Sequence, residues 1–578
     1  MNVFAFTDLP ISDIEDYDKI YHNNIFWLNF NESKSRFINV NNIDYFESND
    51  LDTNNIMILY DKLLDVVTEN LTLFHNRTKS LRYYRIFFGS TLYMLATSYY
   101  YSTKNLKYLK SFFLEESDVK LIFYNLSFEE ILSKDDLVSF ITSREGLQYV
   151  YQFLILNDQS YKFLTKRIIW KTPQKNNFQK SDFKHIFKEK IKRSYFSLLN
   201  ISLARKETIF FSSTESVLKI IFNNLFSNVY YYNFCEKKIK FNYKSVYKLE
   251  LTNETFPENL IVFLNCLFPK QYLLKKEELN KIFKAYKLPK TINNIVTTDL
   301  FKGISVNAYI AEQVNGGSKL YCIQHGGGYK VHKFMTHEFH ERKVSDVFIS
   351  AGIANSKNYN FPESKIINFN LYRKIYDFKF EKDNSENNLI TIQFLDNYYS
   401  EYFPASDITP KFMKNYFNII DELLSKSELK PFNKLNFKLQ LYPRISTYDY
   451  YNYYKNKFKN LKFWPLGVGQ NEVYKNSKLI VLTYFSTAIL ELAYHNRPFV
   501  LLLNSRINYS CSVQKTIDDF VESDIVHYDT DSLLNFLNAT NIDKWFHSAK
   551  IQKVINKFKI DYVWISKYDK FDINKLIK

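Results

Sequence analysis

The chain has 578 residues, enough for two or three domains that each bury a core of their own. Hydrophobic residues make up 46% and charged residues 24%, close to the average for globular proteins, which argues against a disordered chain or a coiled coil. The formal net charge of +16 indicates a basic surface, either a solvated face or one that meets anionic lipid or phosphorylated substrates.

No feature of the sequence indicates export or a membrane span. The first residues lack a basic segment followed by an apolar stretch and a cleavage site. Residues 86–103 are uncharged and long enough to span a bilayer, but Gly, Ser, Thr and four Tyr interrupt them, which favours a buried helix. The scattered Cys235, Cys266, Cys322 and Cys511 are typical of reduced thiols. We expect a cytoplasmic protein, and its charge leaves room for peripheral contact with the inner membrane face.

The predicted elements fall into two parts along the chain. Helical periodicity dominates residues 54–102. After Pro289 the pattern changes to short apolar runs at 294–297, 319–323 and 347–350, separated by turn signals and amphipathic stretches. Strands that alternate with helices predict a parallel sheet.

A second lobe is predicted after the polar run 381–388, the best candidate for a linker. Its expected strands are 389–394, 437–443, 479–483 and 499–503, with helical stretches between them. The sequence thus predicts an α/β fold with a helix-rich N-terminal region and two Rossmann-like lobes. The expected division is an N-terminal lobe of residues 1–380, a C-terminal lobe of 389–545 and a helical tail of 546–578.

A glycine turn follows the predicted strand 319–323. Six of the chain's 11 Gly lie between Gly303 and Gly328, and three of them, Gly326, Gly327 and Gly328, directly follow His325. Glycine permits positive φ and close approach, so this turn could offer backbone N–H groups to an anion at the carboxyl end of a strand. The alternative is a tight connection that needs Gly for its geometry alone.

A cluster of charged and imidazole side chains occupies residues 337–342, which are expected to be helical. Glu338 and Arg342 have the i,i+4 spacing of a surface ion pair. His337 and His340 lie on one side with Glu341, and two imidazoles with a carboxylate could bind a metal. No residue supplies a fourth ligand, so we expect no metal here.

In the C-terminal lobe, Ser486 and Thr487 begin a predicted helix after the strand 479–483. They could cap the helix. The same N-terminus also suits a nucleotide phosphate, with Glu491 one turn further within reach of a ribose hydroxyl. Tyr442 and Arg444 end another strand at the same expected edge, where Arg444 could bind phosphate.

Three D-x-D triplets could in principle hold the metal of a metal-dependent glycosyltransferase. They are Asp16/Asp18, Asp50/Asp52 and Asp529/Asp531. None closely follows an apolar strand, and Asp529 is better placed to cap a helix. The chain has no P-loop, no G-x-G-x-x-G, no G-x-S-x-G and no zinc-finger spacing.

Together these motifs resemble the surface-polysaccharide transferase family of O-antigen clusters, and the match runs nearly from end to end. Residues 80–86 resemble its S-x-R-Y-W-R-I segment, and 324–329 resemble its Q-H-G-G-x-Y-G. Residues 441–443 fit R-L-Y-P, and 476–498 fit N-S-R-L…T-Y…T…L-E…P. Four further positions fit E-E-H…S-D: Glu338, His340, Ser345 and Asp346.

The chain departs from the family pattern at several positions. Lys330 stands where the family has Gly, Phe339 replaces an acidic residue, and Gln440 replaces the Arg before Leu-Tyr-Pro. Residues 351–353 replace Trp-Gly-Trp. These departures bear on which donor and acceptor the chain uses.

The resemblance implies a GT-B-like architecture, with two lobes facing a cleft, the nucleotide on the C-terminal lobe and the acceptor on the N-terminal lobe. It also implies a glycosyltransferase with a nucleotide-activated donor, similar to enzymes that transfer Kdo and related acidic sugars from CMP. The acceptor would be a surface polysaccharide or lipopolysaccharide. No cofactor or metal and no nucleic acid is expected.

The candidate residues can be given roles in glycosyl transfer. Asp299, after the strand 294–297, is the candidate nucleophile or base, and His325 with its glycines would lie beside the reacting centre. Glu338 and His340 would orient or assist. A glycosyl-enzyme intermediate on Asp299 would retain configuration, and activation of the acceptor alone would invert it. The alternatives are a CDP-polyol phosphotransferase of the teichoic-acid type and a basic membrane- or nucleic-acid-binding protein.

Overall fold

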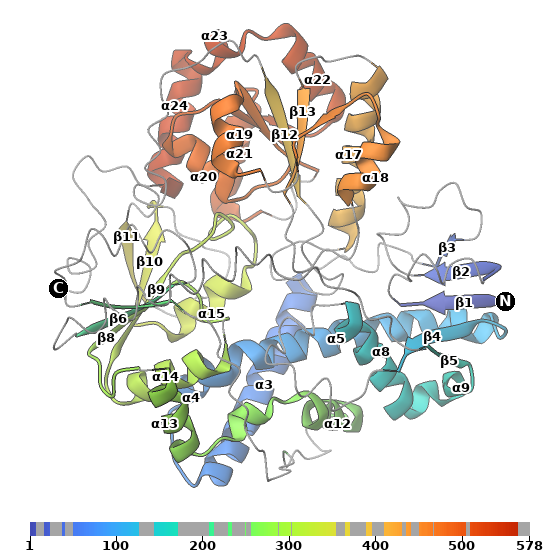
Figure 1. The fold of residues 1–578 in the computed structure, drawn as a ribbon, viewed down its shortest axis with the longest axis vertical. Coiled ribbons are helices and arrows are strands. Elements are labelled where there is room, and N and C mark those ends of the chain that lie inside the picture. Colours follow the sequence, from blue (N-terminus) through green and yellow to red (C-terminus); the bar gives the residue numbers. More distant parts are fainter. Residues whose placement is uncertain are drawn as a thin grey trace.

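The computed structural model describes much of the chain, and the structural statements below concern only that part. The described residues are 1–6, 17–22, 37–40, 50–125, 144–171, 207–212, 229–233, 249, 256–286, 288–301, 303–353, 364–369, 389–395, 410–429, 435–440, 450–465, 468–504 and 509–563. They form three parallel sheets with helices between them (Figure 1).

The first sheet is N-terminal and has the strand order β3-β2-β1-β4-β5, all parallel. Its strands are β1 (Asn2–Ala5), β2 (Lys19–His22), β3 (Phe37–Asn39), β4 (Lys120–Tyr124) and β5 (Ile168–Lys171). The helices around it include α3 (Asp50–His75), α4 (Leu81–Tyr84), η2 (Arg85–Gly89), α5 (Ser90–Glu115), α8 (Arg144–Asn157) and α9 (Lys162–Thr165). The predicted helices are confirmed, whereas the sheet was not predicted.

The middle sheet has the order β11-β10-β9-β8-β6-β7 and is also parallel. Its strands are β6 (Thr208–Ser212), β7 (Val229–Asn233), β8 (Asn294–Thr297), β9 (Lys319–Ile323), β10 (Val347–Ala351) and β11 (Lys365–Phe369). Its helices include α12 (Glu258–Leu267), α13 (Lys276–Ala285), α14 (Ile304–Asn315) and α15 (Thr336–Val344). All three strands predicted for this sheet are present.

The C-terminal sheet has the order β14-β13-β12-β15-β16-β17, which is the 3-2-1-4-5-6 order of a Rossmann fold. Its strands are β12 (Ile390–Leu395), β13 (Leu435–Gln440), β14 (Lys462–Phe463), β15 (Leu479–Leu482), β16 (Phe499–Leu502) and β17 (Val526–His527). Its helices are α17 (Pro410–Leu429), α18 (Tyr450–Lys457), α19 (Gln470–Asn476), α20 (Thr487–Tyr494), α21 (Cys511–Val521), α22 (Thr530–Ala539), α23 (Ile542–Phe546) and α24 (Ala549–Phe558). The predicted α/β class with Rossmann-like parallel sheets is confirmed.

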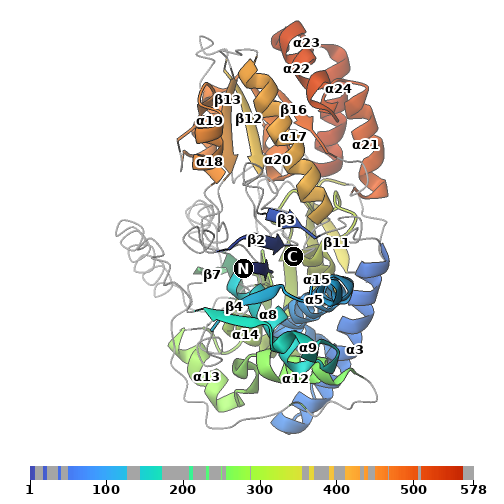
Figure 2. The same cartoon turned by 90° about the vertical axis from the view of Figure 1, so that its right-hand side faces the viewer.

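The middle sheet contributes to two different apolar cores. Because side chains alternate along a strand, Leu320 and Cys322 join the core of the N-terminal helices, while Tyr321 and Ile323 face the other way. The second core continues into the C-terminal lobe, where Phe485 and Ile489 belong to the same cluster. The C-terminal lobe therefore rests on the middle sheet through shared apolar packing (Figures 1 and 2).

The stretch that resembles S-x-R-Y-W-R-I attaches the helices to the middle sheet. Ser80 caps α4 by accepting from the backbone N–H of Tyr83. Arg82 donates to the carbonyl of Val344 (2.8 Å) and to Asp346 Oδ2 (2.7 Å), which also accepts from the backbone of Leu320 (2.7 Å). Two segments that the resemblance linked only by pattern are thus joined directly in space.

The end of the described chain returns to the middle sheet. Gly352, after β10, has φ of +68°, and a Cβ there would lie 2.3 Å from the carbonyl oxygen of Asp561. The N–H of Ile353 donates to the carbonyl of Ile560 (3.1 Å). This close crossing explains why a glycine stands between Ala351 and Ile353.

No described helix combines the length and the apolar character that crossing a bilayer requires.

Candidate active site

Two of the predicted site residues reach one edge of the middle sheet. Asp299 follows β8 and His325 follows β9, and these strands are adjacent and parallel, with Thr297 paired to Cys322. The carboxyl ends of parallel strands meet at the same edge, where open α/β sheets bind their ligands. The predicted placement of Asp299 and His325 is therefore confirmed, and their roles stay predictions.

The glycine turn at this edge touches the C-terminal lobe. The N–H of Gly327 donates to Thr487 Oγ1 (3.0 Å), and a Cβ on Gly327 would lie 2.5 Å from the carbonyl carbon of Ser486. At Gly326 a Cβ would have room, since its nearest neighbour, Thr487 Oγ1, lies 3.8 Å away. At Gly328 a Cβ would lie 2.6 Å from the His332 ring. None of the three has positive φ. The turn needs glycine for close approach, and it brings two separately predicted sites together.

His325 stands at the surface of this edge in front of a buried tyrosine and a buried carboxylate. Its Nδ1 lies 2.8 Å from the hydroxyl of Tyr329, which donates to Glu341 Oε2 at 2.9 Å. The His325 side chain is 31% exposed, whereas Tyr329 is 1% and Glu341 0% exposed. Burial and the carboxylate of Glu341 raise the pKa of Tyr329 far above its usual value, so the hydroxyl keeps its proton.

A chain of ring contacts runs inward from His325. The His337 ring lies 5.3 Å from the His325 ring and 4.1 Å from the ring of Phe301. Phe301 in turn contacts His340 at 5.5 Å. His340 is buried against Gly89 of η2, and burial lowers its pKa to about 3, so it is neutral. Two of the predicted histidines are brought into one cluster, with His325 outside and His340 inside.

Asp299 is partly held by its own loop. Its Oδ1 accepts from the backbone N–H of Phe301 (2.7 Å), and its N–H donates to Thr297 Oγ1 (3.2 Å). The negative charge of Asp299 acts on Tyr329 and on His340, which places the carboxylate near the same cluster. The side chain is thus fixed at the sheet edge by a short turn.

Glu338 and Arg342 form a buried ion pair on α15, so the expectation of a surface pair is wrong. Arg342 donates to Glu338 Oε1 at 3.2 Å, and their side chains are 10% and 3% exposed. Glu338 Oε2 accepts from the backbone N–H of Lys330 (2.8 Å). Glu338 therefore holds the end of the turn that carries His325.

Lys330 stands where the resembled family has Gly, and the backbone explains that preference. Its φ is +63°, in the left-handed region that favours glycine. Its buried ammonium donates to the carbonyls of Ala351 (2.6 Å) and Gly352 (3.2 Å), and burial lowers its pKa to about 7. Its own carbonyl accepts from Ser510 Oγ (2.5 Å), so Lys330 also ties the turn to the C-terminal lobe.

The structure describes part of the predicted donor site of the C-terminal lobe, at the start of α20. Ser486 caps α20 by accepting from the backbone N–H of Ala488 (3.2 Å), which confirms the capping alternative for this residue. Glu491, one turn further, is buried and accepts from the hydroxyl of Tyr474 (3.2 Å). Tyr442 and Arg444 lie outside the described residues.

The loop before α20 crosses the point where the strand order of the C-terminal sheet reverses. β12 lies between β13 and β15, and Thr483, directly after β15, donates from its backbone and hydroxyl to the carbonyl of Gln393 on β12 (3.2 and 3.0 Å). Gln393 also accepts from the Gln470 side chain (2.6 Å). Such a switch point is where nucleotides bind in Rossmann folds.

Three acidic residues of the D-x-D triplets have other partners. Asp52 is buried and pairs with Lys104 (2.6 Å), and Asp531 pairs with Lys426 (2.7 Å). Asp529 caps α22 by accepting from the N–H of Ser532, as predicted. Across the described ranges, no three or more His, Cys, Asp or Glu side chains are grouped as a metal would need. Metal independence remains a prediction.

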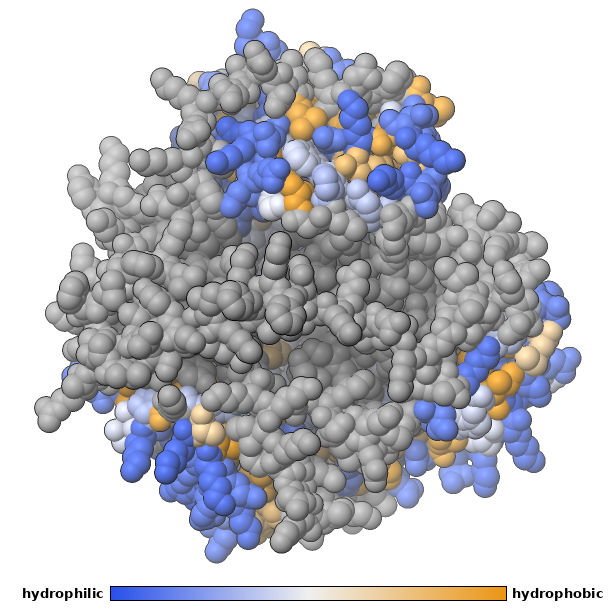
Figure 3. Space-filling model, viewed as in Figure 1, coloured by the Kyte–Doolittle hydropathy of each residue, from blue (hydrophilic) through white to orange (hydrophobic). Residues whose placement is uncertain are grey.

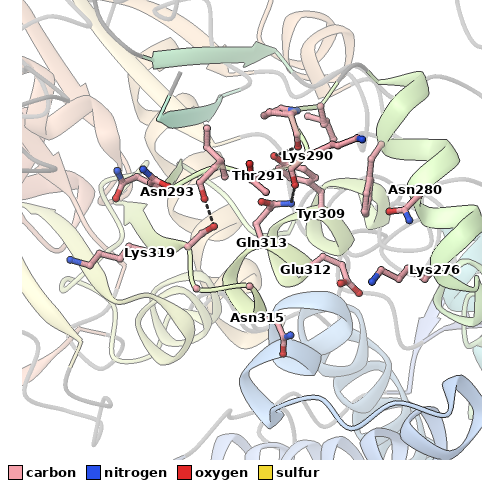
Figure 4. A pocket seen from close by; sticks show the side chains of 18 of the residues that line it. Lys276, Asn280, Lys290, Thr291, Asn293, Tyr309, Glu312, Gln313, Asn315 and Lys319 are labelled. Carbon is pink, nitrogen blue, oxygen red and sulfur yellow. Dashed lines mark hydrogen bonds between the residues drawn. The ribbon is translucent and has the colours of Figure 1, made fainter. Parts of the chain in front are cut away.

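A large pocket lies away from this edge. It has a volume of about 1290 Å³ and includes Asn294 and Lys319, the first residues of β8 and β9, so it sits at the amino end of the strands (Figure 4). Its lining mixes polar and apolar side chains, its charged groups are mostly lysines, and its carboxylate, Glu312, is paired with Lys79 (3.4 Å). The surface over α13 nearby is hydrophilic (Figure 3). The pocket is therefore separate from His325 and Asp299.

Sequence reasoning missed the two residues behind His325. In the sequence, Tyr329 is only part of a motif, and Glu341 is only a possible metal ligand. The i,i+4 spacing of Tyr329 after His325 was a usable signal, because one turn of chain can bring such side chains together. Glu341 could not be assigned in this way, since its contact depends on how α15 packs beneath the turn.

The comparisons with known proteins concern the family and solved structures. Residues 19–573 match the family described as LIC12162 family transferase. Three solved structures are similar over part of this chain: the MnaA–UDP complex of S. aureus, wall teichoic acid polymerase TagF, and MurG of Acinetobacter baumannii. MnaA is 9% identical with a TM-score of 0.34, and the match covers 61% of this chain and 96% of MnaA. TagF is 10% identical with a TM-score of 0.30, over 67% of this chain and 94% of TagF. MurG is 11% identical with a TM-score of 0.30, over 61% of this chain and 99% of MurG. No curated protein matches significantly.

Proposed function

Because this chain belongs to the LIC12162 family of transferases, we propose that it is a glycosyltransferase that moves a sugar from a nucleotide-activated donor to a glycan or glycolipid acceptor. The observation that carries the proposal is the contact between the His325 turn and the start of α20. In this contact, the turn that carries the candidate base His325 lies against a helix N-terminus at the switch point of the other lobe. A base for the acceptor and a helix N-terminus for the departing phosphate would each serve one half of glycosyl transfer.

In the proposed reaction, the acceptor hydroxyl loses its proton as its oxygen bonds to the anomeric carbon, and the nucleotide leaves with the electrons of the broken C–O bond. His325 or Asp299 takes the proton, and this single displacement at the anomeric carbon inverts configuration. Asp299 as nucleophile, with a covalent sugar intermediate, would retain it. Gly327 covers part of the α20 N-terminus, so the phosphate would bind beside this contact.

The finer proposal is a cytidine-linked, Kdo-like acidic sugar as donor and a surface polysaccharide or lipopolysaccharide as acceptor. It includes no metal and no nucleic-acid partner, and it places the protein in the cytoplasm or at the inner membrane face. These points rest on the family-like motifs and on the charge of +16.

A thermal-shift series with CMP, CDP, UDP and GDP tests the proposal, because a ligand that binds only the folded state raises the melting temperature. We expect the largest rise with CMP. A preference for CDP would favour a CDP-polyol phosphotransferase, and no rise with any nucleotide would contradict the enzyme proposal.

Two variants locate the donor in the same assay. Glu491→Ala should weaken the nucleotide response, because the proposal gives this carboxylate a ribose contact. Glu491 also holds the Tyr474 hydroxyl, so Tyr474→Phe serves as the control that removes this bond and keeps the carboxylate. Equal responses in the two variants would reduce Glu491 to a residue that supports Tyr474.

A further inference from the structure

Behind His325, the hydroxyl of Tyr329 carries one proton. Where this proton points decides which ring nitrogen of His325 is protonated. The Tyr329 hydroxyl can donate only once, and two acceptor atoms lie within reach: Glu341 Oε2 at 2.9 Å and His325 Nδ1 at 2.8 Å. A carboxylate is the stronger acceptor, and it has no proton to return. The hydroxyl therefore donates to Glu341, and its oxygen is left to accept from His325.

We infer that Tyr329 and Glu341 are positioning residues that hold His325 as the Nδ1–H tautomer, so that its exposed Nε2 carries the lone pair of a general base. This inference rests on the proposed function and deepens it by assigning the proton-accepting atom. The ring nitrogens of a neutral imidazole are distinct, and the bond made by one decides what the other can do.

Burial supports a role beyond packing for this pair. Glu341 is fully buried and Tyr329 nearly so, and a buried carboxylate costs free energy unless it is hydrogen-bonded. Glu341 Oε1 also lies 3.8 Å from His325 Nδ1, close enough to stabilise the imidazolium that forms after proton transfer. The proton gained by Nε2 would thus be balanced by a carboxylate on the far side of the ring.

The surroundings of His325 are consistent with this assignment. Within the described ranges, the titratable groups in contact with it include His337 from α15, Tyr329 at the end of its own turn and Glu341 behind Tyr329. Asp299, after β8, acts on the same tyrosine. His337 meets His325 through its ring, at an interplanar angle of 75°. Nδ1 of His325 is paired with the Tyr329 hydroxyl at 2.8 Å.

The test reads the tautomer directly, by nitrogen NMR of the full chain labelled with ¹⁵N-histidine, with His325→Asn to assign the signal. At a pH where the ring is neutral, wild type should show a protonated Nδ1 and an unprotonated Nε2. Tyr329→Phe should shift the population towards Nε2–H, and Glu341→Gln should give an intermediate state. Tyr309→Phe is the matched control, because it removes a buried hydroxyl that bonds elsewhere, to the carbonyl of Pro289 (2.9 Å).

An Nε2–H tautomer in wild type, or a Tyr329→Phe spectrum equal to wild type, would overturn the inference. Should Glu341→Gln fail to fold, Tyr329→Phe decides alone, since it removes one hydroxyl and leaves the ring. The measurement needs no substrate, so its outcome is independent of the proposed function. Where turnover is measured, Tyr329→Phe should lower kcat at least about tenfold with nucleotide affinity unchanged, less than the ~10²-fold expected from losing the base itself.

Discussion

His325 and Asp299 reach one sheet edge from neighbouring strands, so their substitution tests the proposed chemistry most directly. His325→Ala and Asp299→Ala should each lower turnover by roughly 10²-fold or more while the nucleotide-induced thermal shift stays unchanged. Turnover should not require added metal and should survive EDTA. Turnover and melting temperature are measured on the same variants. Near-normal turnover, or lost turnover with a collapsed fold, removes the residue concerned from the proposed mechanism.

Lys330 makes stability depend on pH in a predictable direction. Its pKa is about 7 in the folded protein and near 10.5 when exposed, so between these values the unfolded chain keeps a proton that the folded chain releases. Stability should therefore rise with pH in this window. From pH 7 to 9, the free energy of unfolding of wild type should gain up to about 2 kcal/mol relative to Lys330→Met.

Denaturant unfolding at several pH values measures this difference. Lys553→Met, which removes an exposed lysine, is the control and should show no such trend. A constant difference between wild type and Lys330→Met across the window would contradict the shifted pKa.

The residues differ in how far sequence could place them. Asp299 and His325 were predictable because each follows a short apolar run, and the ends of adjacent parallel strands coincide. Glu338 and Arg342 looked like a surface pair, since i,i+4 spacing is the same whether a helix face meets water or another helix. Burial of that face by η2 and by the turn at Lys330 is a tertiary fact that local sequence does not contain.

Among the elements, the contact between the glycine turn and α20 gives a matched pair of substitutions. Gly327→Ala should place a methyl group 2.5 Å from the backbone of Ser486, which must move, so we expect a loss of about 1–3 kcal/mol of stability. Gly326→Ala has its nearest neighbour at 3.8 Å and should cost less. Neither position has positive φ, so the difference in stability between the two variants reports steric crowding by the methyl group and not backbone strain.

Melting temperatures of the two variants check this prediction, and equal losses would contradict it. The nucleotide response of Gly327→Ala is informative as well. Because the methyl group pushes on the start of α20, we expect the response to weaken more than in Gly326→Ala.

The positions of single strands were easier to predict from the sequence than the pairing of strands into sheets. Buried parallel strands are continuous apolar runs, and β8 and β9 were expected at the residues where they occur. The N-terminal sheet was missed because β1, β2 and β3 have only three or four residues each, and the long α3 and α5 dominate the pattern around them. β1 pairs with β4, which lies beyond both helices, and no local signal announces such a pairing.

At the scale of the whole molecule, the described strands of the middle sheet pack on both faces. One face packs on the N-terminal helices and the other on the C-terminal lobe, and α24 adds Ile551 and Phe558 to the second core. The tail predicted as a separate helical unit is thus, in its described part, bound to both lobes. The lobe boundary expected near residues 381–388 marks a change in sequence pattern, and apolar packing continues across the lobes on either side.

This shared core limits how the chain can be split for recombinant work. A fragment of residues 1–380 would expose the apolar face of β9 and β10, and one of 389–578 would expose Phe485 and its neighbours, so each should aggregate alone. Produced together in one cell, the two fragments should purify as a stoichiometric pair that melts in one transition. Two soluble fragments that melt cooperatively and ignore each other on a sizing column would show that the lobes need no common core. Truncated forms chosen at the apparent linker are accordingly poor starting material for crystallisation or binding screens.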